Sequence, residues 1–446
     1  MNTKQIRQTI LDLAIRGELV PQDPTDEPAS VLLERIRAEK EQLIKDKKLK
    51  RDKKDNEPID KVPFELPEGW EWCRGYEILN PMETQKPIGE MFGYIDIASI
   101  DNKNNRIIDA KFISVSEAPS RASRKVKFGD TLFSMVRPYL KNIAFVEEEY
   151  SNCIASTGFY ICSPNKTLYP KFLFYLMLSE YVVNGLNKYM KGDNSPSINN
   201  ENITNFFFPL PPLAEQHRIA QKVEQLLTIV DTIEQLQEEL KALVKQTKNQ
   251  VLNYAIAGKL THQDPNDEPA EELLKRIGKT TATDTPYEKL PEGWACTQLQ
   301  VLCQLLDGEK KEAVSLPYLD VAFLRGRTES NYKESGRYIP KNTHLILVDG
   351  ENSGEIFTTT TEGYQGSTLK ILNISKEINE QYLFYVLKKE QQLFKESKTG
   401  SAIPHLNKKL FKELKVLLPP LAEQHRIVEK IESFFASFDQ IEKELA

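Results

Sequence analysis

The segment 121–141 carries an excess of basic side chains. It contains six lysines and arginines against one aspartate, which gives a net charge of +5. Lys and Arg contact nucleic-acid phosphates, while Arg, Lys, Asn, Gln and Ser also hydrogen-bond to base edges. A solvated basic surface is the alternative interpretation. In this segment the candidate contacts are Arg121, Arg124, Lys125, Ser134, Arg137, Tyr139 and Lys141. A polar turn later in the chain adds Asn194, Ser195 and Asn199.

A second basic segment, 322–347, has five lysines and arginines against two glutamates, a net charge of +3. It lacks the Arg-Pro-Tyr sequence found at 137–139, so its contact surface should differ from the first. In this second basic segment and the part of the chain that follows it, the candidate contacts are Arg325, Arg327, Arg337, Asn352, Ser353, Tyr364, Gln365, Ser401, His405 and Asn407.

The sequence offers no recognisable catalytic constellation. It has no Gly-x-x-x-x-Gly-Lys-Ser/Thr loop for nucleotide phosphates, and the Asn-Pro-Met-Glu at 80–83 departs from Asn-Pro-Pro-Phe/Tyr at its third and fourth positions. Its five histidines lack metal-ligand spacing, and its five cysteines form no Cys-x-x-Cys pair. These observations favour a binding protein. A stand-alone DNA-modifying enzyme or nuclease with unrecognised catalytic residues, and a structural coiled-coil adaptor, remain the alternatives.

The elements that position the candidates are repeated along the chain. Residues 14–36 match 255–277, LPEGW occurs at 66–70 and 290–294, and PPLAEQHRI occurs at 211–219 and 419–427. Residues 4–14 resemble 245–255, which follow the first PPLAEQHRI. The repeat is therefore circular, and we expect the two chain ends to lie side by side.

Each PPLAEQHRI opens a predicted helix, since proline tolerates the first turn and glutamate suits the positive end of the helix dipole. Apolar residues then step by four and three, which is typical of a coiled-coil seam. The seam residues are Ile219, Val223, Leu226, Val230 and Ile233 in the first helix and Ile427, Ile431, Phe434, Phe438 and Ile441 in the second. Gly17 and Gly258 match as helix C-caps, and Asp26 and Asp267 as N-caps of shorter helices. The His-Arg pairs at 217–218 and 425–426 are expected to brace a globular block against its helix.

Between the helices lie two blocks that mix short strand-like runs with turns and end in one helix-like stretch each, 171–186 and 381–396. The predicted division is 1–65 for the N-terminal part of the helical spacer, 66–212 for the first globular domain, 213–289 for the central spacer, 290–420 for the second globular domain, and 421–446 for the C-terminal spacer helix. The predicted class is α+β, with two α/β domains joined by two long antiparallel helices in circular pseudo-twofold symmetry.

Composition limits the remaining possibilities. The chain has 446 residues, a net charge of −6 and 40% hydrophobic residues, enough for several domains with sizeable cores. Its apolar runs are shorter than the ~20 residues of a membrane-spanning helix, and its first ten residues lack the apolar core of a secretory signal. Scattered, unpaired cysteines favour a reducing cytoplasm.

These repeated motifs, and above all the doubled PPLAEQHRI with its following helix, resemble the specificity subunits of Type I restriction–modification systems over essentially the whole chain. The resemblance implies that each globular block is a target-recognition domain for one half of a bipartite site in double-stranded DNA. The segment GDTLFSMVRPY at 129–139 is similar to one that recurs in such domains. The helices would dock two methyltransferase (modification) subunits, and restriction (translocase/nuclease) subunits would complete the enzyme. S-adenosylmethionine and ATP with Mg²⁺ would bind to those partners, and this chain would need no cofactor.

Overall fold

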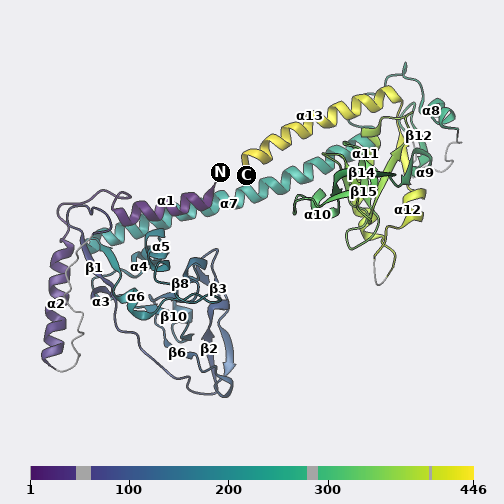
Figure 1. Ribbon diagram of the computed structural model, residues 1–446. Coiled ribbons are helices and arrows are strands. Elements are labelled where there is room, and N and C mark those ends of the chain that lie inside the picture. The colour runs from purple at the N-terminus through teal and green to yellow at the C-terminus, as the bar shows by residue number, and fades with distance from the viewer. Residues whose placement is uncertain (1, 47–61, 279–289, 401–403, 446) are drawn as a thin grey trace. The chain divides into compact units, whose positions relative to one another are not determined.

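The computed structural model describes residues 2–46, 62–278, 290–400 and 404–445. The chain forms two compact units, Met1–Leu236 and Gln237–Ala446, each with its own globular domain and its own stretch of helix (Figure 1). The long helix α7 (Leu213–Ile256) contributes its first half to unit 1 and its second half to unit 2. Within the described ranges, no helix is long and apolar enough to cross a membrane.

In unit 1, α1 (Thr3–Arg16) runs antiparallel to the first half of α7. Arg7, near the start of α1, pairs with Asp231 and Glu234, whereas Gln22, just beyond the end of α1, bonds Glu215 in the first turn of α7. Gly17 ends α1 in the left-handed conformation, as predicted. The shorter helix α2 spans Ala29–Lys45.

The globular domain of unit 1 contains small sheets covered on one side by helices. Its strands and helices are β1 (Glu71–Arg74), α3 (Gly75–Ile78), β2 (Met91–Ile95), β3 (Ile100–Asp101), β4 (Arg106–Ile107), β5 (Lys111–Ser114), β6 (Ala122–Lys125), β7 (Thr131–Ser134), β8 (Ile143–Phe145), β9 (Ile154–Ser156), β10 (Phe159–Cys162), α4 (Pro170–Leu178), α5 (Glu180–Asn187), α6 (Asn200–Thr204) and β11 (Phe207–Leu210). The sheets have the orders β5-β2-β9-β6, β10-β7-β8, β3-β4 and β1-β11. The single helix expected over 171–186 is two helices, because Ser179 ends α4 in an extended conformation and caps α5 through Val182 N.

Unit 2 repeats this plan with different strand lengths. Its elements are α8 (Ala270–Ile277), β12 (Ala295–Gln298), α9 (Leu299–Leu302), β13 (Cys303–Leu306), β14 (Glu309–Leu319), α10 (Val321–Leu324), β15 (Tyr332–Ile339), β16 (His344–Leu347), β17 (Ile356–Thr358), β18 (Gly363–Gln365), β19 (Leu369–Ile374), α11 (Glu380–Glu396), α12 (Lys408–Glu413), β20 (Lys415–Leu418) and α13 (Leu421–Leu445). A four-stranded sheet has the order β13-β19-β16-β17, β14, β15 and β18 close into a small barrel, and β12 pairs with β20. The second half of α7 and α13 run antiparallel, since Lys248 pairs with Asp439 and Glu442 while Thr261 bonds Glu423.

Both units confirm the mixed α/β class and the antiparallel long helices. Of the predicted seam, Ile219, Val223 and Val230 are buried in unit 1, with Leu226 and Ile233 half-buried. Ile427 and Ile431 are buried in unit 2, and Phe438 and Ile441 are half-buried. Phe434 is exposed instead, and its neighbour Phe435 packs on the core. The predicted seam is therefore wrong at Phe434 and continues at Phe438 and Ile441.

Candidate nucleic-acid interface

The Arg-Pro-Tyr segment of unit 1 forms a tight, outward-pointing turn. The one-turn 3-10 helix η3 (Pro138–Leu140) is flanked by Arg137 and Lys141, which both adopt the left-handed conformation with φ of 48° and 52°. Non-glycine residues in this region carry strain that persists only where the surroundings impose it. The turn presents Tyr139 and Leu140 to solvent, with 46% and 42% of their surface exposed.

Two neighbouring segments hold this turn. Arg137 N donates to Pro196 O at 2.8 Å, and its guanidinium Nη2 donates to Asn194 O at 2.7 Å. From the other side, the amide of Asn102 donates to Leu140 O and that of Asn105 to Lys141 O, both at 3.0 Å. The structure therefore brings together two groups that the sequence analysis chose separately, the Arg-Pro-Tyr turn and the polar turn 194–199.

The rest of the basic segment is partly neutralised within the domain. Lys125 and Lys127 both pair with Glu83, and these hydrogen bonds lower the pKa of the Glu83 carboxyl to about 2. Arg121 is exposed, Arg124 is half-buried, and Lys141 is half-buried with its pKa lowered by desolvation. Within the Arg-Pro-Tyr turn, the exposed cation is thus Arg137.

Unit 2 contains the same turn with other residues. Gly350 N donates to Pro404 O at 2.7 Å, as Arg137 N does to Pro196 O, and Gly350 takes the matching positive φ of 109°. His405 Nδ1 lies 2.7 Å from Asp349 Oδ1. Asn352 and His405 are exposed beside this turn, but Gly350 stands where unit 1 has the arginine. The second domain consequently offers little positive charge at this position.

Several of the predicted contact residues are buried, cap helices or form ion pairs within the domain. Ser134, Ser353, Tyr364 and Gln365 are buried, so the structure gives their side chains no surface through which to touch DNA. Asn199 and Asn407 cap α6 and α12, and Asn194 and Ser195 are exposed. Arg325 pairs with Glu355, Arg337 pairs with Asp307 at 2.5 Å, and Arg327 is exposed without an ion pair among the described residues. Ser401 lies outside the described residues.

The exposed strands β14 and β15 carry basic residues that were not among the candidates. Lys310 and Lys311 on β14 were not among the candidates because they precede the basic segment that we selected by its charge. Residues 332–338 show no period-two alternation, so the pattern of residue types gives no strand signal there.

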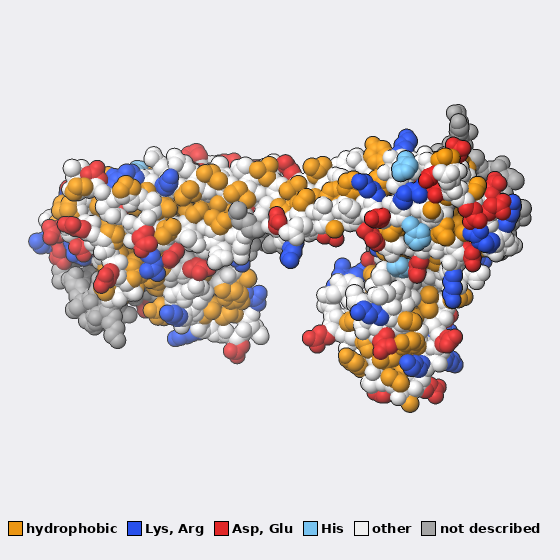
Figure 2. Space-filling model, turned by 90° about the horizontal axis from the view of Figure 1, so that it is seen from above, with side chains coloured by type: hydrophobic (Ala, Val, Ile, Leu, Met, Phe, Trp, Pro, Cys, Tyr) orange, Lys and Arg blue, Asp and Glu red, His pale blue; other side chains and the backbone are white. Residues whose placement is uncertain are grey.

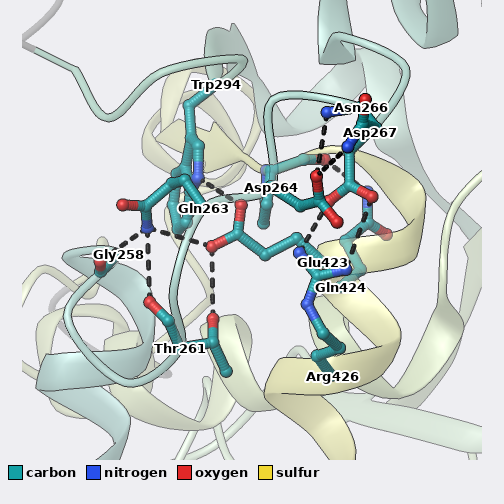
Figure 3. Close-up of polar contacts among 11 residues, drawn as sticks. Gly258, Thr261, Gln263, Asp264, Asn266, Asp267, Trp294, Glu423, Gln424 and Arg426 are labelled. Atoms are coloured by element: carbon teal, nitrogen blue, oxygen red, sulfur yellow. Dashed lines mark hydrogen bonds and ion pairs between the residues drawn. The ribbon is translucent and has the colours of Figure 1, made fainter.

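The repeated motifs form a polar network that joins each globular domain to its helices (Figure 3). In unit 2, the buried carboxylate of Glu423 accepts hydrogen bonds from Trp294 Nε1 at 2.9 Å, Gln263 Nε2 at 3.1 Å and Thr261 Oγ1 at 3.2 Å. Gln263 also donates to Gly258 O at 2.9 Å, and Arg426 pairs with Asp267 at 2.6 Å. A single turn of α13 thereby connects the end of α7, the entry to α8 and the LPEGW segment.

Unit 1 repeats the network almost atom for atom. Glu215 accepts from Trp70 Nε1 at 2.9 Å and Gln22 Nε2 at 3.2 Å, and Arg218 pairs with Asp26 at 2.7 Å. Val20 stands where unit 2 has Thr261, so the third donor is missing. Burial raises the pKa of Glu215, against the lowering effect of its two hydrogen bonds. The prediction that Asp26 and Asp267 cap helices is wrong, because both accept from arginine and Pro269 stands at the cap position of α8.

The residues next to these glutamates attach the globular domains. Gln216 accepts from Tyr169 N at 2.7 Å and donates to Thr167 O, while Gln424 accepts from Asn379 N at 2.8 Å. His217 packs against the Tyr169 ring, and His425 Nδ1 lies 2.9 Å from Asn379 Nδ2. The histidines thus contact the globular domains as expected, whereas the arginines of the His-Arg pairs bind Asp26 and Asp267 ahead of α2 and α8.

Comparison with known families identifies the family to which this chain belongs. A family model described as "Type I restriction modification DNA specificity domain" matches residues 75–242 and 292–446, one match in each half. This chain belongs to that family. It is a Type I restriction–modification specificity subunit by membership, and target recognition on DNA is the family's role.

Individual relatives agree with this assignment. The Escherichia coli EcoAI specificity subunit is 31% identical over 389 residues, 68% of this chain, but the match spans only 63% of that relative. The Escherichia coli EcoEI specificity subunit is 26% identical over 99% of this chain and 90% of its own length. Among solved structures, the HsdS subunit from Thermoanaerobacter tengcongensis has a TM-score of 0.58 at 27% identity, covering 87% of this chain and 94% of that one. A chain from a study of complex assembly and conformational transition of the type I R-M system gives 0.67 at 26% identity, covering 86% and 94%.

Proposed function

We propose that this chain is the sequence-reading subunit of a Type I restriction–modification enzyme and has no catalysis of its own. It binds a bipartite site in double-stranded DNA, with one recognition domain for each half-site. Two methyltransferase subunits dock on its helices, and restriction subunits with translocase and nuclease activity complete the assembly. S-adenosylmethionine and ATP with Mg²⁺ bind to those partners, and the complex works in the cytoplasm.

One observation carries this proposal. The same polar network, built on Glu215 in unit 1 and Glu423 in unit 2, holds two globular domains whose exposed turns differ. The first turn offers Arg137 and Tyr139, whereas the second offers Gly350 and Asn352 at corresponding places. A repeated frame with two dissimilar surfaces suits recognition of two different half-sites.

The helices also offer surfaces for partners. In unit 1, α7 leaves Ile229 and Leu236 exposed by 55% and 57%, and in unit 2 it leaves Leu240 and Leu243 exposed by 37% and 56%. Hydrophobic side chains are visible along this helical part of the molecule (Figure 2). Large exposed apolar residues that gather on one element mark interaction sites, and these residues support the docking of partner subunits on α7.

Co-expression with a neighbouring methyltransferase gene tests the proposal. Methylated adenines are mapped across a host genome by long-read sequencing, and we expect a single split motif with two short halves around a fixed unspecified spacer. Methylation or cleavage by the isolated chain would instead support a stand-alone enzyme. A soluble complex that methylates no defined motif would support the structural adaptor.

A further inference from the structure

The second recognition domain carries a longer exposed β-ribbon than the first. Strands β14 and β15 pair antiparallel, and residues 309–315 of β14 and 332–335 of β15 are all exposed. In the first domain, β2 and β9 form the parallel pair that β14 and β18 form in the second, and β6 pairs with β9 as β15 pairs with β18. There, however, β2 pairs antiparallel with β5 over only four residues, whereas β14 and β15 have 11 and 8 residues. The length of the ribbon is therefore a feature of one reader and not of the shared frame.

The pairing register defines the two faces of the ribbon. Residues directly opposite each other in an antiparallel pair point to the same side, and successive residues alternate. Lys310 lies opposite Arg337 and Glu312 opposite Ser335, so these four share one face. Lys311 and Gly336 share the other face, where a Cβ on Gly336 would come within 3 Å of the buried Tyr364 ring. The face with Lys310 and Arg337 is thus the outer one.

This outer face keeps an unfavourable arrangement of charge. Like charges directly opposite on neighbouring strands destabilise a sheet, yet Lys310 and Arg337 are such a pair. One carboxylate, Asp307, serves two cations, pairing with Arg337 at 2.5 Å and with Lys370 at 2.7 Å. Lys310 has no ion pair among the described residues. Natural sequences break local rules of this kind mainly at functional sites.

The shape and the side chains fit the major groove of DNA. That groove is about 12 Å wide and admits a two-stranded ribbon. Arg and Lys bind the O6 and N7 atoms of guanine, Glu accepts from the N4 amine of cytosine, and Ser bonds either type of edge. All four outer residues belong to these types. The ribbon also places two basic side chains, Lys310 and Arg337, on its outer face, in the domain where Gly350 replaces the arginine of the first domain.

We infer that the β14–β15 ribbon enters the major groove of the half-site read by the second domain, with Arg337 and Lys310 contacting base edges. This inference rests on the proposed function. It assigns the readout of that half-site to a strand pair, whereas the first domain presents the Arg137–Lys141 turn.

The test uses the complex of this chain with its co-expressed methyltransferase. The split motif of the unaltered complex is mapped first, and methylation rates are then measured on duplexes with single-base changes in each half. Arg337→Ala and Lys310→Ala should relax discrimination at one or two adjacent base pairs of one half by roughly ten- to a hundredfold, the range for losing one bidentate base contact. Arg337→Lys keeps the charge but loses the planar fork, so it should relax the same positions. Lys376→Ala, an exposed lysine between β19 and α11, is the matched control and should change nothing.

The unaffected half of the motif reports on folding, because a misfolded chain would lose both halves together. Unchanged discrimination in the Arg337 and Lys310 variants would overturn the inference, as would a uniform loss of rate at an unaltered motif. A complex that forms but methylates no split motif before any substitution would overturn the proposed function itself, and the ribbon inference with it.

Discussion

Replacement of Glu423 by glutamine should weaken unit 2 although the two side chains have nearly the same shape. The carboxylate accepts hydrogen bonds from three donors, and it is fully buried. A glutamine has one oxygen and one NH2 group, so its NH2 must face either the indole N–H of Trp294 or the amide of Gln263. Rotating the Gln263 amide does not solve this conflict, because its Nε2 also donates to Gly258 O.

At least one buried donor therefore loses its partner in Glu423→Gln. An unsatisfied buried donor costs about 1–3 kcal/mol, which corresponds to a fall in melting temperature of roughly 2–12 °C for a unit of this size. Thermal unfolding followed by calorimetry measures the shift, and hydrogen exchange locates it. Protection should fall around Trp294 and the start of α13, while the globular domain of unit 1 keeps its protection.

Glu429→Gln is the matched control, since Glu429 is exposed on the same helix. It removes the same charge without touching the network. The reasoning is refuted if Glu423→Gln melts within the error of Glu429→Gln, because the buried carboxylate would then contribute no more than a surface one. Glu215→Gln provides a second check, and it should destabilise unit 1 instead.

Three further predictions follow from the geometry. Arg137→Ala should relax discrimination in the half-site opposite to that affected by Arg337→Ala, by about ten- to a hundredfold if Arg137 holds a base, and duplexes with single-base changes measure this. Glu83→Gln releases Lys125 and Lys127, so it should raise the affinity for DNA and steepen the salt dependence of binding, which fluorescence anisotropy measures. In the unaltered chain the same ion pairs stabilise the fold above pH 4.5 and are lost as the pH falls towards 2, because the pKa of the Glu83 carboxyl is lowered. A titration of this carboxyl by NMR would follow the loss. Gly258→Ala should destabilise unit 2 by about 1–3 kcal/mol in urea unfolding, because φ is 66° and the new Cβ would lie 2.6 Å from Pro291, whereas the exposed Gly326, with φ of 66° and open space around it, should cost less on the same change.

The repeats allowed much of the frame to be predicted. Helix starts at 213 and 421 and the left-handed Gly17 depend on short-range rules, such as cap chemistry and periodicity, that one segment carries by itself. Because the motifs are repeated, the same local structure could be expected for both copies. The predicted division into domains stays a prediction.

The partners of the repeated residues could not be read from the chain. The sequence placed Glu423, Trp294 and Gln263 in three separate motifs, and only the fold brings the polar atoms of Trp294 and Gln263 within 3.1 Å of the Glu423 carboxylate. Asp267 was assigned to a cap because it precedes a helix, but α8 begins later, at Ala270 with Pro269 as its cap. The Asp267 carboxylate instead accepts a charged hydrogen bond from Arg426, more than 150 residues away.

By itself the sequence determined the repeat, the helical seams, the two basic segments and the resemblance that follows from them. Only the tertiary structure decided which cations remain free to bind DNA, because that depends on which carboxylates fold back onto them, as Glu83 does on Lys125 and Glu355 on Arg325. It also decided which face of the β14–β15 ribbon points outward, since strand register is set by pairing across the sheet and not by the strand alone.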